Sequence, residues 1–116
     1  MEPIFNSRGQ VVGWLKGDLV LDRNNRYRAL VRNGNVFSFR GAHLGTFDSG
    51  FFRDKSGHCV SFLKGAQGGP ITPITQISPI PPIPPVAPIA PIPPIPPIPP
   101  IGSLSWSYQD WEGFLG

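Results

Sequence analysis

Apolar and polar positions alternate in four blocks along residues 4–63, and the blocks repeat every sixteen residues. In each block an apolar pair is followed by a polar turn, a short apolar strand and a second break. Four sets of equivalent positions define the repeat. The residues that open the turn are Asn6, Asp22, Ser38 and Asp54, and those that end it are Gly9, Asn25, Gly41 and Gly57. A small residue follows at Gly13, Ala29, Gly45 and Ser61, and an apolar residue at Leu15, Val31, Phe47 and Leu63. Such repetition predicts an array of four similar units.

Each unit is predicted to be a β-hairpin. Runs rich in Val, Phe and Leu that are bounded by Asp, Asn, Ser and Gly are typical of short strands joined by turns. Asn, Asp and Ser side chains bond their own backbone in turns, and Gly and Asn tolerate positive φ. No capped helical period precedes residue 66. We expect an all-β fold in which four hairpins form a shallow closed or barrel-like ring, with its symmetry within one chain or between chains.

Period-two alternation divides each second strand between two faces. Residues 11, 13 and 15 and their counterparts form one face, which we assign to the interior because small residues suit strands that converge on an axis. Residues 12 and 14 form the other face, which includes Trp14 and Arg28 and is expected to be partly exposed. The candidate ligand-binding residues are those that would line the axis: Gly13, Leu15, Ala29, Val31, Gly45, Phe47, Ser61 and Leu63.

Composition divides the 116 residues into three parts: 1–66 with the hairpins, 67–102 rich in Pro and Ile, and 103–116 with an aromatic end. The first part holds all ten Lys and Arg against five acids, a net charge of +5, whereas the remainder holds two acids. Fifteen of the sixteen prolines follow residue 66, so only the first part is expected to bury a core. A core of that size is marginal without a partner or ligand.

The hairpin units resemble the bacterial 4-fold β-flower family. The resemblance rests on recurring units of turn, glycine, strand and glycine, as in Ser7-Arg8-Gly9 with Gly17 and Asp54-Lys55-Ser56-Gly57 with Gly65. A Pro-rich tail and a Trp-containing C-terminal segment follow, as in that family; Asn25 stands where a glycine is expected. The resemblance implies a small symmetric β-barrel similar to tubby-type lipid-binding domains, and it implies no catalytic residues.

Every third residue from Ile71 to Ile101 is Ile or Val, and Pro precedes each one except Ile77. Polyproline II has three residues per turn, so this spacing places an aliphatic stripe along one edge of a rod. The rod could be a semi-rigid spacer, docked or free. A spacer does not need Ile at every third position, however, so a partner surface on this barrel, on another copy or on another protein is the competing interpretation. Its candidate binding residues are Ile83, Ile89 and Ile95.

The C-terminal segment combines acidic and aromatic residues, and it follows a basic domain. Four large aromatic side chains are costly to leave in water, so docking is favoured over a frayed end. The candidate docking residues are Trp106, Tyr108, Trp111 and Phe114.

The sequence offers little for catalysis. Cys59 adjoins His58, but neighbours on a strand point to opposite faces, and His43 is the other histidine. Two histidines, one cysteine and scattered acids have no metal-ligand spacing, and we expect no cofactor and no enzymatic activity. The basic residues are dispersed, which does not favour nucleic-acid binding. No apolar leader opens the sequence, and no proline-free run of 18 apolar residues occurs, so a cytoplasmic location is expected.

Two functions remain in competition, with an enzyme a distant third. The first is a non-catalytic binding or scaffold module that self-associates, most simply as a homo-oligomer, through the Ile stripe and the aromatic tail. The second is a lipid or hydrophobic-ligand binder that uses the apolar centre of the ring. Basic residues such as Arg28 and Arg53 at its rim would favour anionic lipid.

Overall fold

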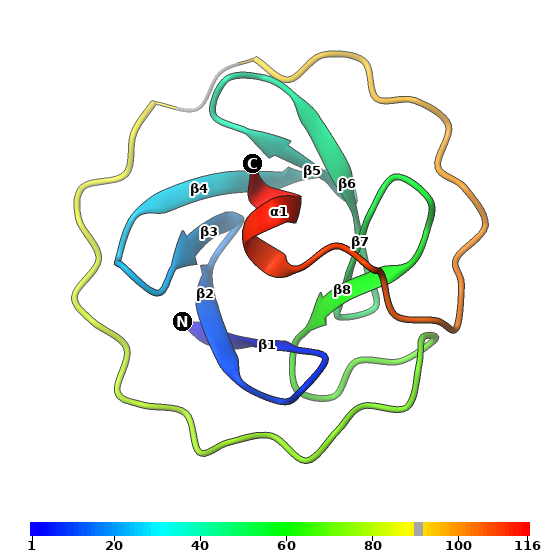
Figure 1. Ribbon diagram of the computed structural model, residues 1–116. Helices are drawn as coiled ribbons and strands as arrows, with labels where there is room; N and C mark the ends of the chain where they lie inside the picture. Colours follow the sequence, from blue (N-terminus) through cyan, green and yellow to red (C-terminus); the bar gives the residue numbers. More distant parts are fainter. Residues whose placement is uncertain (90–91) are drawn as a thin grey trace.

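The hairpin repeats form a closed eight-stranded antiparallel barrel within one chain. A computed structural model of the protein describes residues 1–89 and 92–116. Strands β1 to β8 follow one another around the barrel in sequence order, and β1 pairs with β8 to close it (Figure 1). Their bounds are Glu2–Asn6, Val11–Lys16, Leu19–Asp22, Tyr27–Arg32, Asn35–Ser38, His43–Asp48, Phe51–Arg53 and Cys59–Phe62. The all-β prediction is confirmed, and the four-fold arrangement lies inside a single chain.

The four turns within the hairpin units are built alike. The side chain that opens the β1–β2 turn, Asn6, accepts hydrogen bonds from the backbone N–H groups two and four residues later, at 2.9 and 3.0 Å. Asp22, Ser38 and Asp54 accept the equivalent pairs of bonds in the other units. The residues that end these turns all have positive φ, including Asn25 at 61°. The predicted turn chemistry is therefore confirmed in all four units.

Each unit also contains a β-bulge at the same place. In the first unit Ile4 lies opposite Gly13 while Phe5 lies opposite Val11, so Val12 is an extra residue. The corresponding shifts make Arg28, Leu44 and Val60 the extra residues of the other units. A bulge interrupts strict alternation, so residues before and after it no longer share a face.

The bulge makes part of the face assignment wrong. The small and apolar columns do face the interior, as Ala29 and Leu15 show by their place in the main core. The column at position 11 does not, because Val11 and Cys59 belong to a separate apolar cluster that also contains Trp14 and Trp106. The bulge residues Val12, Leu44 and Val60, which were expected on the exposed face, pack on the main core instead.

A short helix, α1 (Trp111–Leu115), closes one end of the barrel (Figure 1). Asp110 caps it by accepting a hydrogen bond from the Gly113 N–H at 2.7 Å. Trp111, Phe114 and Leu115 are buried among the core side chains of the strands. No helix in the described residues is long and apolar enough to cross a bilayer.

We call residues 70–102 the belt; its described residues, 70–89 and 92–102, run around the outside of the barrel and return close to where they began (Figure 1). The described residues of the belt form neither helix nor strand. Thirty-one residues of polyproline II would span about 95 Å, the circumference of a ring about 30 Å across. The two larger extents of the molecule are 36 and 35 Å, so a belt of this length covers most of one circuit.

Candidate functional site

The residues predicted to line the axis belong to a filled core. Leu15 and Leu63 are buried, and Val31 and Phe47 are half-buried and pack on the same cluster. Ala29 and Ser61 are fully buried. The aromatic rings of α1 add to this core, with Phe52 and Trp111 5.2 Å apart between ring centroids. The apolar centre of the barrel is therefore occupied by the chain's own side chains.

At two of the four positions that carry small residues, contact between neighbouring strands explains the glycine, and alternation alone does not indicate this. A Cβ at Gly13 would overlap the carbonyl oxygen of Leu21 on the neighbouring strand, and one at Gly45 would overlap that of Arg53. At Gly45 the Cβ would also lie 2.8 Å from the ring of Phe114. Close approach of adjacent strands beside the bulge, rather than crowding at the axis alone, therefore requires glycine at these two positions.

The aromatic tail lies against its own barrel. Trp111 and Phe114 are buried in the core, and Trp106 packs outside the barrel against Phe62, with their ring centroids 5.9 Å apart. The backbone of Cys59 bonds to Ser105 and Ser107, which adds a short bridge between β8 and the tail. Tyr108 differs from the other three aromatic residues, because its side chain is fully exposed.

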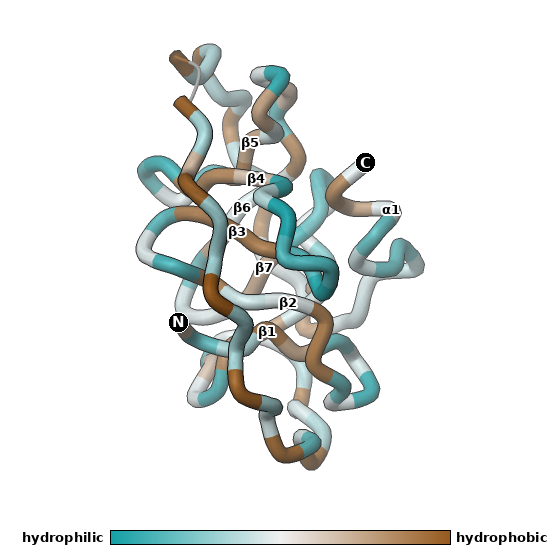
Figure 2. Tube along the Cα trace, turned by 90° about the vertical axis from the view of Figure 1, so that its left-hand side faces the viewer, coloured by the Kyte–Doolittle hydropathy of each residue, from teal (hydrophilic) through white to brown (hydrophobic). Residues whose placement is uncertain are grey.

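The aliphatic stripe of the belt faces away from the barrel. Each of its members is 91–97% exposed, and they recur as brown positions along the belt in Figure 2. We call this set the aliphatic row: Ile71, Ile74, Ile77, Ile80, Ile83, Val86, Ile89, Ile92, Ile95, Ile98 and Ile101. The possibility that the stripe packs on the barrel of the same chain is therefore wrong. The half-buried belt residues lie on its other edges, for example Thr75, Pro84 and Pro93.

The belt and the residue that follows it bond to the first, second and fourth hairpin turns. At the first turn the Gln76 N–H donates to the carbonyl oxygen of Gly9 at 2.9 Å. At the second turn Asn25 Nδ2 donates to the carbonyl oxygen of Ile83 at 2.8 Å, and at the fourth the Ser103 N–H donates to that of Gly57 at 3.0 Å. The bonded residues Gln76, Ile83 and Ser103 thus hold the start, the middle and the end of the belt against the barrel.

Arg53 holds both ends of the belt. Its buried guanidinium donates from Nη1 to the carbonyl oxygens of Gly57 and Ser103 and from Nη2 to that of Gly68, each at 2.7 Å. Gly68 precedes the belt and Ser103 follows it, so one side chain joins the two ends. The equivalent residues of the other three repeats are Phe5, Leu21 and Phe37. The sequence predicts Arg53 at a rim of the barrel, and the presence of a charged residue in an otherwise apolar column is the signal that indicates its different role.

Arg28 connects the barrel to α1. Its Nη1 donates to Asp22 at 3.0 Å and to Glu112 at 2.9 Å, and its Nη2 donates to the carbonyl oxygen of Gly116 at 2.8 Å. Burial acts to raise the pKa of Asp22, but hydrogen bonds from the Arg26 N–H, Arg28 and the Asn24 N–H lower it overall. Burial acts to lower the pKa of Arg28, but its two carboxylate partners raise it.

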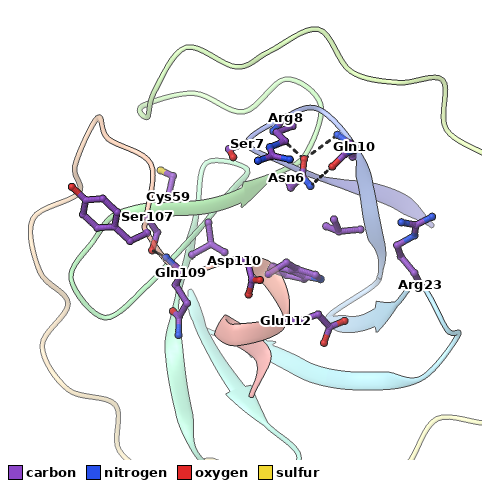
Figure 3. Close-up of a pocket in the computed structure, with 14 residues that line it drawn as sticks. Asn6, Ser7, Arg8, Gln10, Arg23, Cys59, Ser107, Gln109, Asp110 and Glu112 are labelled. Carbon is purple, nitrogen blue, oxygen red and sulfur yellow. Dashed lines mark hydrogen bonds between the residues drawn. The ribbon is translucent and has the colours of Figure 1, made fainter.

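A polar cleft of about 500 Å³ opens beside α1. Its wall includes the turn with Asn6, Ser7 and Arg8, the start of α1 with Asp110 and Glu112, and Arg23 on the far side (Figure 3). The acidic groups are already used, because Asp110 caps the helix and Glu112 pairs with Arg28. The cleft therefore brings together polar surface, and at its edge the Ser107 hydroxyl donates a hydrogen bond to Asp54 Oδ2.

The surroundings of Cys59 and His43 favour the neutral form of each side chain. Burial raises the pKa of the Cys59 thiol; the charge of Arg53 partly offsets this rise, and the charge of Asp54 adds to it. The unreactive thiol form is therefore favoured. His43 Nε2 lies 3.1 Å from Asn35 Oδ1, and burial together with Lys55 lowers the pKa of His43. Within residues 1–89 and 92–116, no group of three His, Cys, Asp or Glu side chains could hold a metal ion.

Comparison with protein families gives one match. The family described as 4-fold beta flower protein matches residues 2–115, which include the barrel, the belt and α1. No curated protein and no solved structure matches the chain.

Proposed function

This chain belongs to the 4-fold β-flower family, and we propose that it is a non-catalytic assembly module that associates with further copies through the aliphatic row. The exposure of the row is the observation that carries this proposal. Burying one aliphatic side chain stabilises by roughly 1.5–3 kcal/mol, which corresponds to about 60–120 Å² of apolar surface. Together, the eleven residues of the row therefore present several hundred Å² or more of apolar surface to solvent.

The rest of the fold supports a presenting role. The belt docks on the turns and is held by Arg53, so the row is displayed on a scaffold instead of collapsing onto the core. The aromatic tail, which the sequence also suggested for assembly, packs on its own barrel and stabilises that scaffold. A ligand in the barrel centre has less support, because core side chains fill that space.

A charge substitution in the row tests the proposal. We expect Ile74→Lys with Ile89→Lys to weaken self-association at least tenfold, because each interface contact at these positions would bury a cation. Thr72→Lys with Ala87→Lys is the matched control, since both residues are exposed, lie off the row, have the same spacing and add the same charge. Sedimentation velocity from 1 to 500 μM measures the association. A wild-type protein that stays monomeric throughout, or equal behaviour of the two variants, would contradict the proposal.

A further inference from the structure

We propose that the surface bound by the aliphatic row is the row of a second copy, so that two belts interlock edge to edge. This inference rests on the proposed function and names the partner surface. Four observations lead to it: the spacing of the row, the absence of charge along the belt, the chemistry of its backbone and the course of the row around the barrel.

The spacing of the row is self-complementary. The triplet repeat of the row predicts polyproline II, in which three residues advance about 9.3 Å, so neighbouring row residues would stand about that far apart. A side chain inserted midway lies about 4.7 Å from each of them, close to the 4.0–4.5 Å at which apolar heavy atoms make contact. The Ile residues of one belt therefore fit between those of another belt shifted by half a repeat. A flat apolar surface would leave these gaps unfilled.

Charge favours contact between two belts. No acidic or basic residue lies between Lys64 and Asp110, whereas the barrel carries a net +5. Two copies that meet through their barrels bring together like charges, while two copies that meet through their belts bury none. Because burying an unpaired charge is costly, the belt is the part of the surface where a copy approaches at least cost.

The backbone of the belt favours a protein partner over a lipid bilayer. A polyproline II segment has no internal hydrogen bonds, and its carbonyl oxygens depend on water. Insertion of the row into hydrocarbon would remove water from the carbonyl groups beside it, at several kcal/mol for each unsatisfied group. Two interlocked ridges touch along a narrow line and leave the neighbouring carbonyls hydrated.

The course of the row indicates an open assembly. The described residues of the belt run around the outside of the barrel (Figure 1), and every member of the row is 91–97% exposed. One neighbour covers only an arc, and three or four row residues contribute roughly 200–500 Å² by the same conversion. That is below the roughly 800 Å² per partner of a standard interface. Each contact is therefore weak, further arcs stay free, and association should continue beyond a dimer.

Charge complementation between two variants tests this pairing. Four evenly spaced row residues are changed to Lys in one variant and to Glu in the other: Ile71, Ile80, Ile89 and Ile98. We expect each variant alone to sediment as a 12.6 kDa monomer, because like charges meet at every belt contact. An equimolar mixture should associate again, and 0.5 M NaCl should reverse that association.

Two controls separate this proposal from its alternatives. In the first control, Thr72 and Ala87, which lie off the row, are changed to Lys in one variant and to Glu in the other. Mixing these two variants should not increase their association. Flotation with uncharged liposomes tests lipid as the partner. If the wild type self-associates but the Lys and Glu variants do not restore association when mixed, the belts do not meet and this inference is wrong, although the proposed function stands. If the wild type floats with liposomes and the row variants do not, lipid is the partner and this inference is wrong. A wild type that is monomeric contradicts both this inference and the proposed function.

Discussion

The barrel and the belt use the same residue type in opposite ways. Ile4 in β1 is 0% exposed and lies in the core, whereas the Ile residues of the belt are 91–97% exposed. Both segments have a regular apolar period, two in the strands and three in the belt. A strand pairs with neighbours that close around its apolar face, but the belt docks through its backbone and its other edges. Periodicity therefore predicts that apolar side chains share an edge, and not which way that edge faces.

Changing Ile to Ala in the barrel and in the belt should give the largest difference in stability between the two regions. Ile4→Ala leaves a cavity in the core and is expected to lower the free energy of unfolding by about 2–5 kcal/mol. Ile89→Ala, in the exposed row, should change it by less than about 0.5 kcal/mol when measured on the monomer. Urea denaturation at low micromolar concentration measures both. A cost at Ile89 as large as that at Ile4 would mean that the row is buried in the monomer.

Breaking the link between the regions should have an intermediate effect. Arg53→Leu restores the apolar character of the equivalent position in the second repeat, but it removes the donors to Gly57, Gly68 and Ser103. We expect the free energy of unfolding to fall by about 3 kcal/mol, because buried carbonyl oxygens lose their hydrogen-bond donor.

Hydrogen exchange locates that effect. The Ser103 amide, which bonds to Gly57 at the end of the belt, should lose protection in Arg53→Leu. The Asn25 backbone amide, bonded to Asp22 within its own turn, should keep it. Uniform loss of protection in both amides would show that Arg53 stabilises the barrel as a whole and not the closure of the belt.

Acid should lower the stability of the barrel but leave association through the belt unchanged. The loss of stability should be smaller than that of the substitutions above. The folded pKa of Asp22 lies below its usual value of 3.8, so between these two values the unfolded chain binds more protons. The stability from this carboxylate is fully present above about pH 4 and is lost as the pH falls through the folded pKa. Self-association through the uncharged row should not follow that dependence.

Asp22→Asn provides the test. Urea midpoints from pH 7 to pH 2 should converge for the wild type and the variant as the pH falls, because protonation removes the charge that the substitution removes. Curves that stay parallel would show that the charge of Asp22 does not contribute.

Strands, turns and the aromatic tail could be inferred from the sequence because their signals are local. Asn6 and its counterparts bond backbone groups two and four residues away, so the turn is encoded where it forms. The bulge could not be inferred, because it depends on register between strands: Val12 is extra only in relation to Ile4 and Phe5 on β1. For that reason position 11 was assigned to the wrong face, while positions 13 and 15 were assigned correctly.

By itself the sequence determined the number of repeats, the hairpins, the turn chemistry and the triplet spacing of the row, since each depends on residues within about sixteen positions of one another. Only the tertiary structure decided which face of each strand is buried, that α1 closes one end of the barrel and that the row points outward. Those outcomes depend on contacts across the chain, such as Arg53 with Ser103 and Asn25 with Ile83. No local pattern specifies such a contact, because its energy arises only when the two segments are brought together.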